Sequence, residues 1–291
     1  MKCRDTIELG SVHVALSGEA SLLMLRHSDA FRPFFSAGGN ERWHIVMDVP
    51  FSLPDGMELL SAFPFEDNLF DCRFCMLADT FFFVMSKPDG SVGVALRHER
   101  NSSLVELTPS ADYQALKFAI WFAISLLSSY DSVTFVHSST VVCHGRAVMF
   151  LGDSGTGKST HSRLWLKHID DSSILNDDSP MLSLRDGTAP VVYGSPWSGK
   201  EPHYLNRHYP LAAIVRLSQA AQNDIRHLSA VESFVALQPS LPPALMQSGF
   251  FADLLMPVIS SVVATVPFYR LQCLPDADAA HMCHSSVFPE L

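Results

Sequence analysis

The sequence predicts a mixed α/β protein in which a mainly antiparallel β region precedes a domain of alternating strands and helices. Short alternating or aromatic runs, broken by turn residues, fill residues 8 to about 110. An apolar helical segment follows, and beyond it a glycine-rich loop separates an apolar strand from a helix. With 291 residues the chain has room for two domains, which we expect at 1–111 and 112–291.

The first region contains runs typical of strands, for which we expect Ser11–Leu16, His44–Val49 and Thr80–Met85. Lys87-Pro-Asp-Gly90 lies between the apolar runs 81–85 and 92–96, which predicts an antiparallel hairpin. We find no group of catalytic side chains in this region, so the sequence assigns it no role.

The second region begins with Asp112, which can cap an apolar helix running to about Ser129. Two strands are expected at 132–142 and 146–151, joined by a turn at His144-Gly145. A helix at 158–168 follows the glycine-rich loop. Further on we expect strands at 173–175, 181–184, 191–192, 211–217 and 266–271, and helices near 230–237, 251–263 and 276–284.

Composition excludes some classes of partner. The chain has 20 Lys and Arg against 30 Asp and Glu, a net charge of −10, which disfavours nucleic acid and anionic membranes. The first residues carry no apolar run, so we expect no signal peptide and a cytoplasmic protein. The most apolar window, Tyr113–Leu127, is too short to span a bilayer. Cys72 and Cys75 lack a second cysteine or histidine pair, which favours structural thiols over a zinc site.

The strongest chemical signal is a phosphate-binding loop that fits the pattern G-x-x-x-x-G-K-[ST]. Its backbone N–H groups would point at phosphate oxygens, and the following helix would add its positive N-terminal end. Lys158 would bridge the β- and γ-phosphates, and the Ser159 hydroxyl would bind Mg²⁺. The residues expected to bind ATP are Gly152, Asp153, Ser154, Gly155, Thr156, Gly157, Lys158, Ser159 and Thr160.

A second component is the acidic pair Asp177 and Asp178, which follows a short apolar run at a strand end. Phosphoryl transfer needs a carboxylate near Mg²⁺ and a group that orients or deprotonates the attacking hydroxyl. Two adjacent acids can divide these duties. The sequence leaves open which of them is the metal ligand and which the base.

The loop GDSGTGKST, the pair Asp177 and Asp178, and His137, fifteen positions before Gly152, together resemble the HPr kinase and PEP carboxykinase superfamily. In HPr kinases a histidine starts the same β-hairpin. The resemblance implies an HPr kinase-like P-loop domain over 112–291, and a kinase that uses ATP and Mg²⁺ to phosphorylate a serine or other hydroxyl of a protein or small molecule. It also implies a homo-oligomer.

The same resemblance implies catalytic roles for His137, Lys158, Asp177 and Asp178, with His137 assisting or orienting the base. Ser159, Asp177 and Asp178 would hold the metal, and Arg270 would reach the phosphates. Residues 193–200, rich in Gly and Ser, have a composition suited to a loop that closes on a ligand, or are an ordinary surface loop.

Two alternatives remain at this point. A nucleotide-binding sensor or scaffold would keep the loop without the chemistry, and it is favoured by the first region, which does not resemble the N-terminal domain of HPr kinases. A phosphorylase, which runs the transfer backwards with inorganic phosphate or pyrophosphate, would share the same site.

Overall fold

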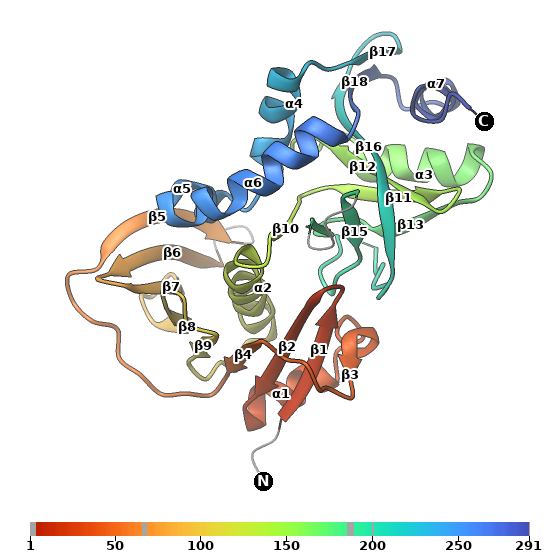
Figure 1. Cartoon of the computed structure of the whole chain (residues 1–291). Helices are drawn as coiled ribbons and strands as arrows, with labels where there is room; N and C mark the ends of the chain where they lie inside the picture. Colours follow the sequence, from red (N-terminus) through yellow and green to blue (C-terminus); the bar gives the residue numbers. More distant parts are fainter. Residues whose placement is uncertain (1–3, 66–68, 185–188, 200, 291) are drawn as a thin grey trace. The chain divides into compact units, whose positions relative to one another are not determined.

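A computed structural model describes residues 4–65, 69–184, 189–199 and 201–290. The chain divides into two compact units. Unit 1 comprises Met1–Asp131 and Ala244–Ala252, and unit 2 comprises Ser132–Pro243 and Asp253–Leu291. Each unit contains a large mixed sheet accompanied by helices (Figure 1), so the predicted mixed α/β class is confirmed.

The sheet of unit 1 has the order β3-β1-β2-β4-β9-β8-β7-β6-β5. Only the β2–β4 and β4–β9 pairs are parallel, so the described strands are mainly antiparallel, as expected. Their bounds are β1 (Arg4–Leu9), β2 (Val12–Ser17), β3 (Phe35–Ser36), β4 (Trp43–Val46), β5 (Glu58–Phe65), β6 (Phe70–Leu77), β7 (Thr80–Ser86), β8 (Val92–Glu99) and β9 (Leu104–Leu107). The predicted hairpin is β7–β8, closed by a 2.8 Å bond from Lys87 N to Ser91 O.

Helix α1 (Glu19–Arg26) was not predicted, because its own N-terminal residue Gly18 offers no capping side chain. The cap comes from a residue distant in sequence. Asp48 Oδ2 accepts hydrogen bonds from the backbone N–H groups of Ala20 at 3.0 Å and Ser21 at 3.2 Å. The signal for this helix start therefore exists only after the chain has folded.

Helix α2 (Tyr113–Ser129) has the predicted cap, since Asp112 Oδ1 accepts from Ala115 N at 3.0 Å. The helix packs on β7 and β8, and the rings of Phe83 and Phe122 stack with centroids 4.0 Å apart. It therefore belongs to unit 1, and the division falls after Asp131 instead of at the expected boundary of 111.

Unit 1 is completed by the segment Ala244–Ala252, which returns to it after most of unit 2. Its Phe251 is fully buried, and its ring lies 4.9 Å from that of Phe81 and 6.2 Å from that of Phe74. Cys72 and Cys75 are free and buried in the same unit. Burial raises the pKa of the Cys72 thiol to about 12, as expected of a structural thiol.

The sheet of unit 2 has the order β10-β14-β15-β16-β12-β11-β13, with β18 pairing β16 and β17. The strands are β10 (Val133–Phe135), β11 (Ser139–Cys143), β12 (Arg146–Leu151), β13 (Ser172–Asn176), β14 (Met181–Ser183), β15 (Val191–Tyr193), β16 (His208–Gln219), β17 (Asp224–His227) and β18 (Phe268–Cys273). Strands β12, β16 and β18 are parallel neighbours, while β11–β12 and β11–β13 are antiparallel.

The later helices are α3 (Lys158–His168), α4 (Ala230–Leu237), α5 (Pro243–Gln247), α6 (Gly249–Thr265) and α7 (Ala277–Val287). Helices α3 and α4 have the predicted bounds, while α6 and α7 extend beyond theirs and α5 was not predicted. Helix α3 covers β11, β12 and β13, with α7 beside it (Figure 1). Among the described helices, none combines the length and the apolar character that a membrane crossing requires.

The strand predicted at 132–142 is two strands, β10 and β11, because the chain changes partners between them. β10 pairs with β14, whereas β11 pairs with β12 and β13. Between the two strands, Val136 N donates to Pro180 O at 3.0 Å and Ser138 N donates to Asp178 O at 3.0 Å. The break places residues 136–138 beside the predicted acidic pair.

Candidate functional site

The sheet of unit 2 brings the predicted site residues to one edge. Ser139 at the start of β11 pairs with Phe150 near the end of β12, and Thr140 pairs with Asn176 at the end of β13. The residues before β11 and after β12 and β13 must therefore lie near one another. These are the positions of His137, of the glycine-rich loop and of the acidic pair.

The loop lies between β12 and α3, the strand–loop–helix setting that the sequence predicted. Three of its glycines, Gly152, Gly155 and Gly157, have φ values of 156°, 79° and 108°. Side chains rarely tolerate such backbone angles, so glycine is needed for the path of the loop. Within the loop, Thr156 N donates to Asp153 O at 3.1 Å. Ser154, Ser159 and Thr160 lie where the sequence placed them, in the loop and in the first turn of α3.

Lys158, the first residue of α3, folds its side chain back across the loop. Its Nζ donates to Gly152 O at 2.9 Å and to Asp153 O at 3.4 Å. Burial lowers the pKa of Lys158, while the charges of Asp178, Asp177 and Asp153 oppose this shift. The ammonium group is thus partly desolvated and surrounded by the acids predicted to act with it.

His137 lies between β10 and β11 and contacts the acidic pair. Its Nε2 is 3.8 Å from Asp178 Oδ1, and its backbone N–H donates to Ser240 O at 2.7 Å. Burial lowers the pKa of His137, and the charge of Lys158 lowers it further, while Asp178 and Asp153 act in the opposite sense. The net shift favours the neutral form of the ring.

The acidic pair is held by Asn176, a fully buried residue at the end of β13. Its Oδ1 accepts from the backbone N–H groups of Asp178 at 3.0 Å and Ser179 at 2.9 Å. Its Nδ2 donates to Trp197 O at 2.9 Å and to Ser195 O at 3.3 Å. One amide thus fixes both the turn that carries the aspartates and the segment that follows β15.

The two aspartates have different surroundings. Asp178 Oδ2 accepts from Ser179 Oγ at 2.8 Å, its Oδ1 faces His137, and its side chain is 41% exposed. Asp177 has a buried Oδ1 that no described residue hydrogen-bonds. A buried carboxylate oxygen without a donor is costly unless a cation or another ligand satisfies it.

Arginines from the neighbouring parallel strands flank the loop. Leu151, the residue before the loop, pairs with Arg216 on β16, which in turn pairs with Arg270 on β18. Arg216 Nη2 lies 2.9 Å from Asp153 Oδ1. Arg270, which the resemblance implied near the phosphates, lines a cavity of about 580 Å³ together with Arg216 and the loop residues Asp153 and Thr156.

A second cavity, of about 400 Å³, borders the other part of the loop. Polar groups of Gly155, Gly157 and Thr160 meet there with the apolar side chains of Leu164 and Leu217. His161 also lines it, and burial lowers the pKa of this histidine to about 4. Its volume and its mixed polar and apolar lining fall within the range of small-molecule sites.

In the segment 193–200 only residues 193–197 differ from both of the expected forms, while Ser198 is half-buried and Gly199 is exposed. Residues 193–197 are buried, with Ser195 fully inaccessible and Trp197 only 6% exposed. Ser195 Oγ donates to Ser179 O at 2.6 Å. These residues are part of the packed wall behind the aspartates and neither a surface loop nor a free flap, while Lys200 lies outside the described residues.

The structure thus brings together His137, Lys158, Asp177, Asp178 and the loop at one edge of a sheet. Sequence reasoning missed the roles of Asn176 and Arg216. Arg216 carries a signal, since it is a cation inside the apolar strand β16. Asn176 carries a partial signal, because its Oδ1 accepts from residues two and three positions on, as in an Asx-turn, whereas the Nδ2 partner Trp197 is 21 residues away.

Comparison with models of known protein families gives no match, and comparison with curated proteins gives none either. Function is therefore inferred from the residues of this site and from the resemblance of its motifs.

Proposed function

We propose that this chain binds ATP with Mg²⁺ at residues 152–160 and transfers the γ-phosphoryl group to a hydroxyl acceptor on a protein or small molecule, as an HPr kinase-like enzyme. One observation carries the proposal. A glycine-rich loop, the lysine at the head of its helix, a histidine and two aspartates gather at the edge where β12 ends. Phosphoryl transfer needs this set of charges.

The loop and α3 would hold the phosphates. Backbone N–H groups of the loop and the positive end of α3 favour an anion. The ammonium group of Lys158 would exchange its present carbonyl partner, Gly152 O, for phosphate oxygens. The nucleoside would occupy the cavity of about 400 Å³ beside Thr160. Arg216 and Arg270, on the other side of Asp153 and Thr156, supply further positive charge near the loop.

The donor set beside the loop fits Mg²⁺, which prefers oxygen ligands. Ser159, the second residue of α3, offers a hydroxyl, and the buried Oδ1 of Asp177 has no hydrogen-bond donor among the described residues. Bound Mg²⁺ would neutralise charge on the β- and γ-phosphates. We therefore assign Asp177 to the metal and Asp178 to the acceptor hydroxyl.

Asp178 has the exposure and the partner that a general base requires. Its carboxylate faces His137 at 3.8 Å and remains 41% exposed, so an acceptor hydroxyl can reach it. The ring of His137, whose pKa is lowered, can orient the Asp178 carboxylate and stabilise the charge when Asp178 takes up the proton of the acceptor hydroxyl.

The test is calorimetric titration of the chain with ATP and Mg²⁺, followed by turnover of γ-labelled ATP with protein and small-molecule hydroxyl acceptors. Lys158→Ala should reduce turnover about a hundredfold, which corresponds to about 3 kcal/mol of transition-state stabilisation. Lys167→Ala, at the exposed end of the same helix, is the matched control and should keep wild-type activity. A Lys158→Ala loss below about threefold would contradict the assignment.

The acidic pair gives the second arm of this test. Asp177→Asn should raise the Mg²⁺ concentration needed for half-maximal turnover, whereas Asp178→Asn should lower kcat at saturating Mg²⁺. The alternative of a sensor or scaffold predicts Mg²⁺-dependent ATP binding without labelled product in any variant. Absence of Mg²⁺-dependent affinity for any nucleoside triphosphate would refute both.

A further inference from the structure

A second group of ligand-type side chains lies at the opposite end of β12 from the phosphate loop. Cys143 ends β11, His144 occupies the turn before β12, and His284 lies on α7. One ligand atom from each, the sulfur and two ring nitrogens, lie within 4.8 Å of one another. Since β12 runs from 146 to 151, this cluster is about 17 Å from the loop along the strand.

The hairpin turn fixes the first two members of the cluster. Cys143 pairs directly with Arg146, which leaves a two-residue turn of His144 and Gly145 with φ values of 49° and 72°. This is the left-handed geometry of a tight hairpin turn. Cys143 is fully buried, while His144 is exposed, so the cluster has a buried thiol and an open side through which an ion can enter.

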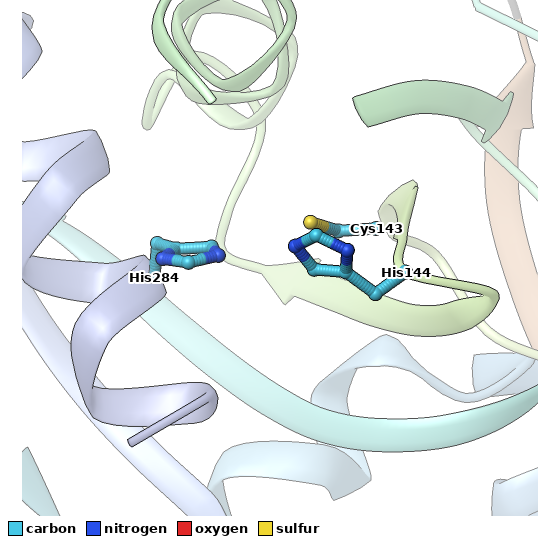
Figure 2. Close-up of side chains that lie close together, drawn as sticks. All are labelled: Cys143, His144 and His284. Carbon is cyan, nitrogen blue, oxygen red and sulfur yellow. The ribbon is translucent and has the colours of Figure 1, made fainter. Parts of the chain in front are cut away.

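His284 is held in place by aromatic neighbours but is not satisfied. Its ring lies 5.6 Å from that of Trp165 and 5.4 Å from that of Phe288. Its Nε2 is buried and has no hydrogen-bond partner among the described residues. Figure 2 shows the Cys143 sulfur and a ring nitrogen of His144 and of His284 directed into the same space. Buried nitrogens of this kind are normally paired.

We propose that Cys143, His144 and His284 form a binding site for Zn²⁺, independent of the phosphate loop. One thiolate and two imidazoles are the ligands that Zn²⁺ takes in proteins, and they disfavour Mg²⁺ and Ca²⁺, which prefer oxygen. Tetrahedral bonds of about 2.0–2.3 Å would hold the ligand atoms about 3.3–3.8 Å apart. The cluster therefore needs a contraction of up to about 1 Å, and rotation of the exposed His144 ring can shorten its distances to the other two ligand atoms.

Neighbouring groups complete the site. Asp171 Oδ2 lies 3.9 Å from His144 Nδ1, so a small movement lets this carboxylate orient the ring through the nitrogen that does not bind the metal. A water molecule would take the fourth position. The bound ion would tie the β11–β12 turn to α7. A reactive thiol is a poorer explanation, because burial raises the pKa of Cys143 and leaves it a weak nucleophile without a metal.

The experiment uses the full chain, stripped with a chelator and titrated with Zn²⁺ or Co²⁺ and no nucleotide. We expect one ion per chain, a thiolate-to-cobalt charge-transfer band, and a higher melting temperature with Zn²⁺. Excess Mg²⁺ should displace neither ion.

Cys143→Ser should abolish the charge-transfer band, and His144→Asn should weaken binding at least about tenfold. Asparagine tolerates the left-handed turn, so the second variant should fold as wild type. Cys273→Ser, which removes another thiol of unit 2, is the control and should keep the band. Absence of binding to the wild-type chain, or unchanged binding in both cluster variants, would overturn the site. Neither result would bear on ATP binding.

Discussion

The amide of Asn176 offers a quantitative test of how the acidic turn is built. Replacement by alanine removes the partner of the backbone N–H groups of Asp178 and Ser179, and it leaves the Trp197 carbonyl with only the longer 3.2 Å contact from Ser195 Oγ. A buried polar group that loses its partner costs about 1–3 kcal/mol. Water entering the space left by the amide offsets part of this, so we expect a loss of about 3–5 kcal/mol in the free energy of unfolding.

Urea unfolding, followed by far-ultraviolet circular dichroism, measures this loss. With a slope of about 2–3 kcal/mol per molar urea, the midpoint for Asn176→Ala should fall by about 1–2 M. Ser173→Ala, an exposed position on the same strand, is the matched control and should change the free energy by less than about 0.5 kcal/mol. A loss under about 1 kcal/mol for Asn176→Ala would refute the claim that this amide organises the turn.

Two further predictions concern α3 and its start. His161 is 3% exposed, and burial lowers its pKa to about 4. The unfolded chain therefore binds a proton at His161 near pH 6.5, whereas the folded chain binds it only near pH 4. The contribution of His161 to the free energy of unfolding should therefore be full above pH 6.5 and fall by about 3 kcal/mol as the pH drops through 4. His161→Gln should lack this pH dependence when urea unfolding is compared at pH 7 and pH 4. An equal pH dependence in both proteins would contradict the prediction. Gly157 has a φ of 108° and open space at the Cβ position. Gly157→Ala should therefore cost about 1–3 kcal/mol of backbone strain without a steric clash, and it should lower ATP affinity in calorimetry. Unchanged stability would contradict this prediction, because it would show that the loop relaxes freely.

Local signals allowed much of the secondary structure to be predicted. Helix α2 begins at its own capping residue Asp112, and α4 begins with a complete capping box of Ser229 and Glu232. Helix α1 has no local capping side chain, and Asp48, in the loop after β4, supplies its cap instead. An interaction between distant segments leaves no trace in a local window, so this element could not be predicted.

The site was predictable as a set of residues but not as an arrangement. The spacing of Gly152, Gly157 and Lys158 indicates a phosphate loop because the chemistry requires those residue types in that order. The pairing of Leu151 with Arg216, and of Arg216 with Arg270, depends on strand register across more than a hundred residues. Hydrophobic patterns do not encode such pairings between distant strands.

The boundary between the two units could not be predicted from the sequence either. A change from strand-rich to helix-rich patterning falls near residue 111, and it suggested a boundary there. The apolar face of α2 packs on β7 and β8, so contacts place this helix with the preceding strands. Patterning shows where one kind of element ends, but only packing decides which elements share a core.

The return of Ala244–Ala252 to unit 1 constrains how the protein is made. During synthesis the ribosome releases β1 to β9 and α2 long before Phe251, whose ring fills the space beside Phe81. The aromatic core of unit 1 therefore stays partly exposed until most of unit 2 has been synthesised. A fragment ending at Asp131 would lack Phe251, so proteolysis or gene truncation at that point cannot yield a fully packed unit 1.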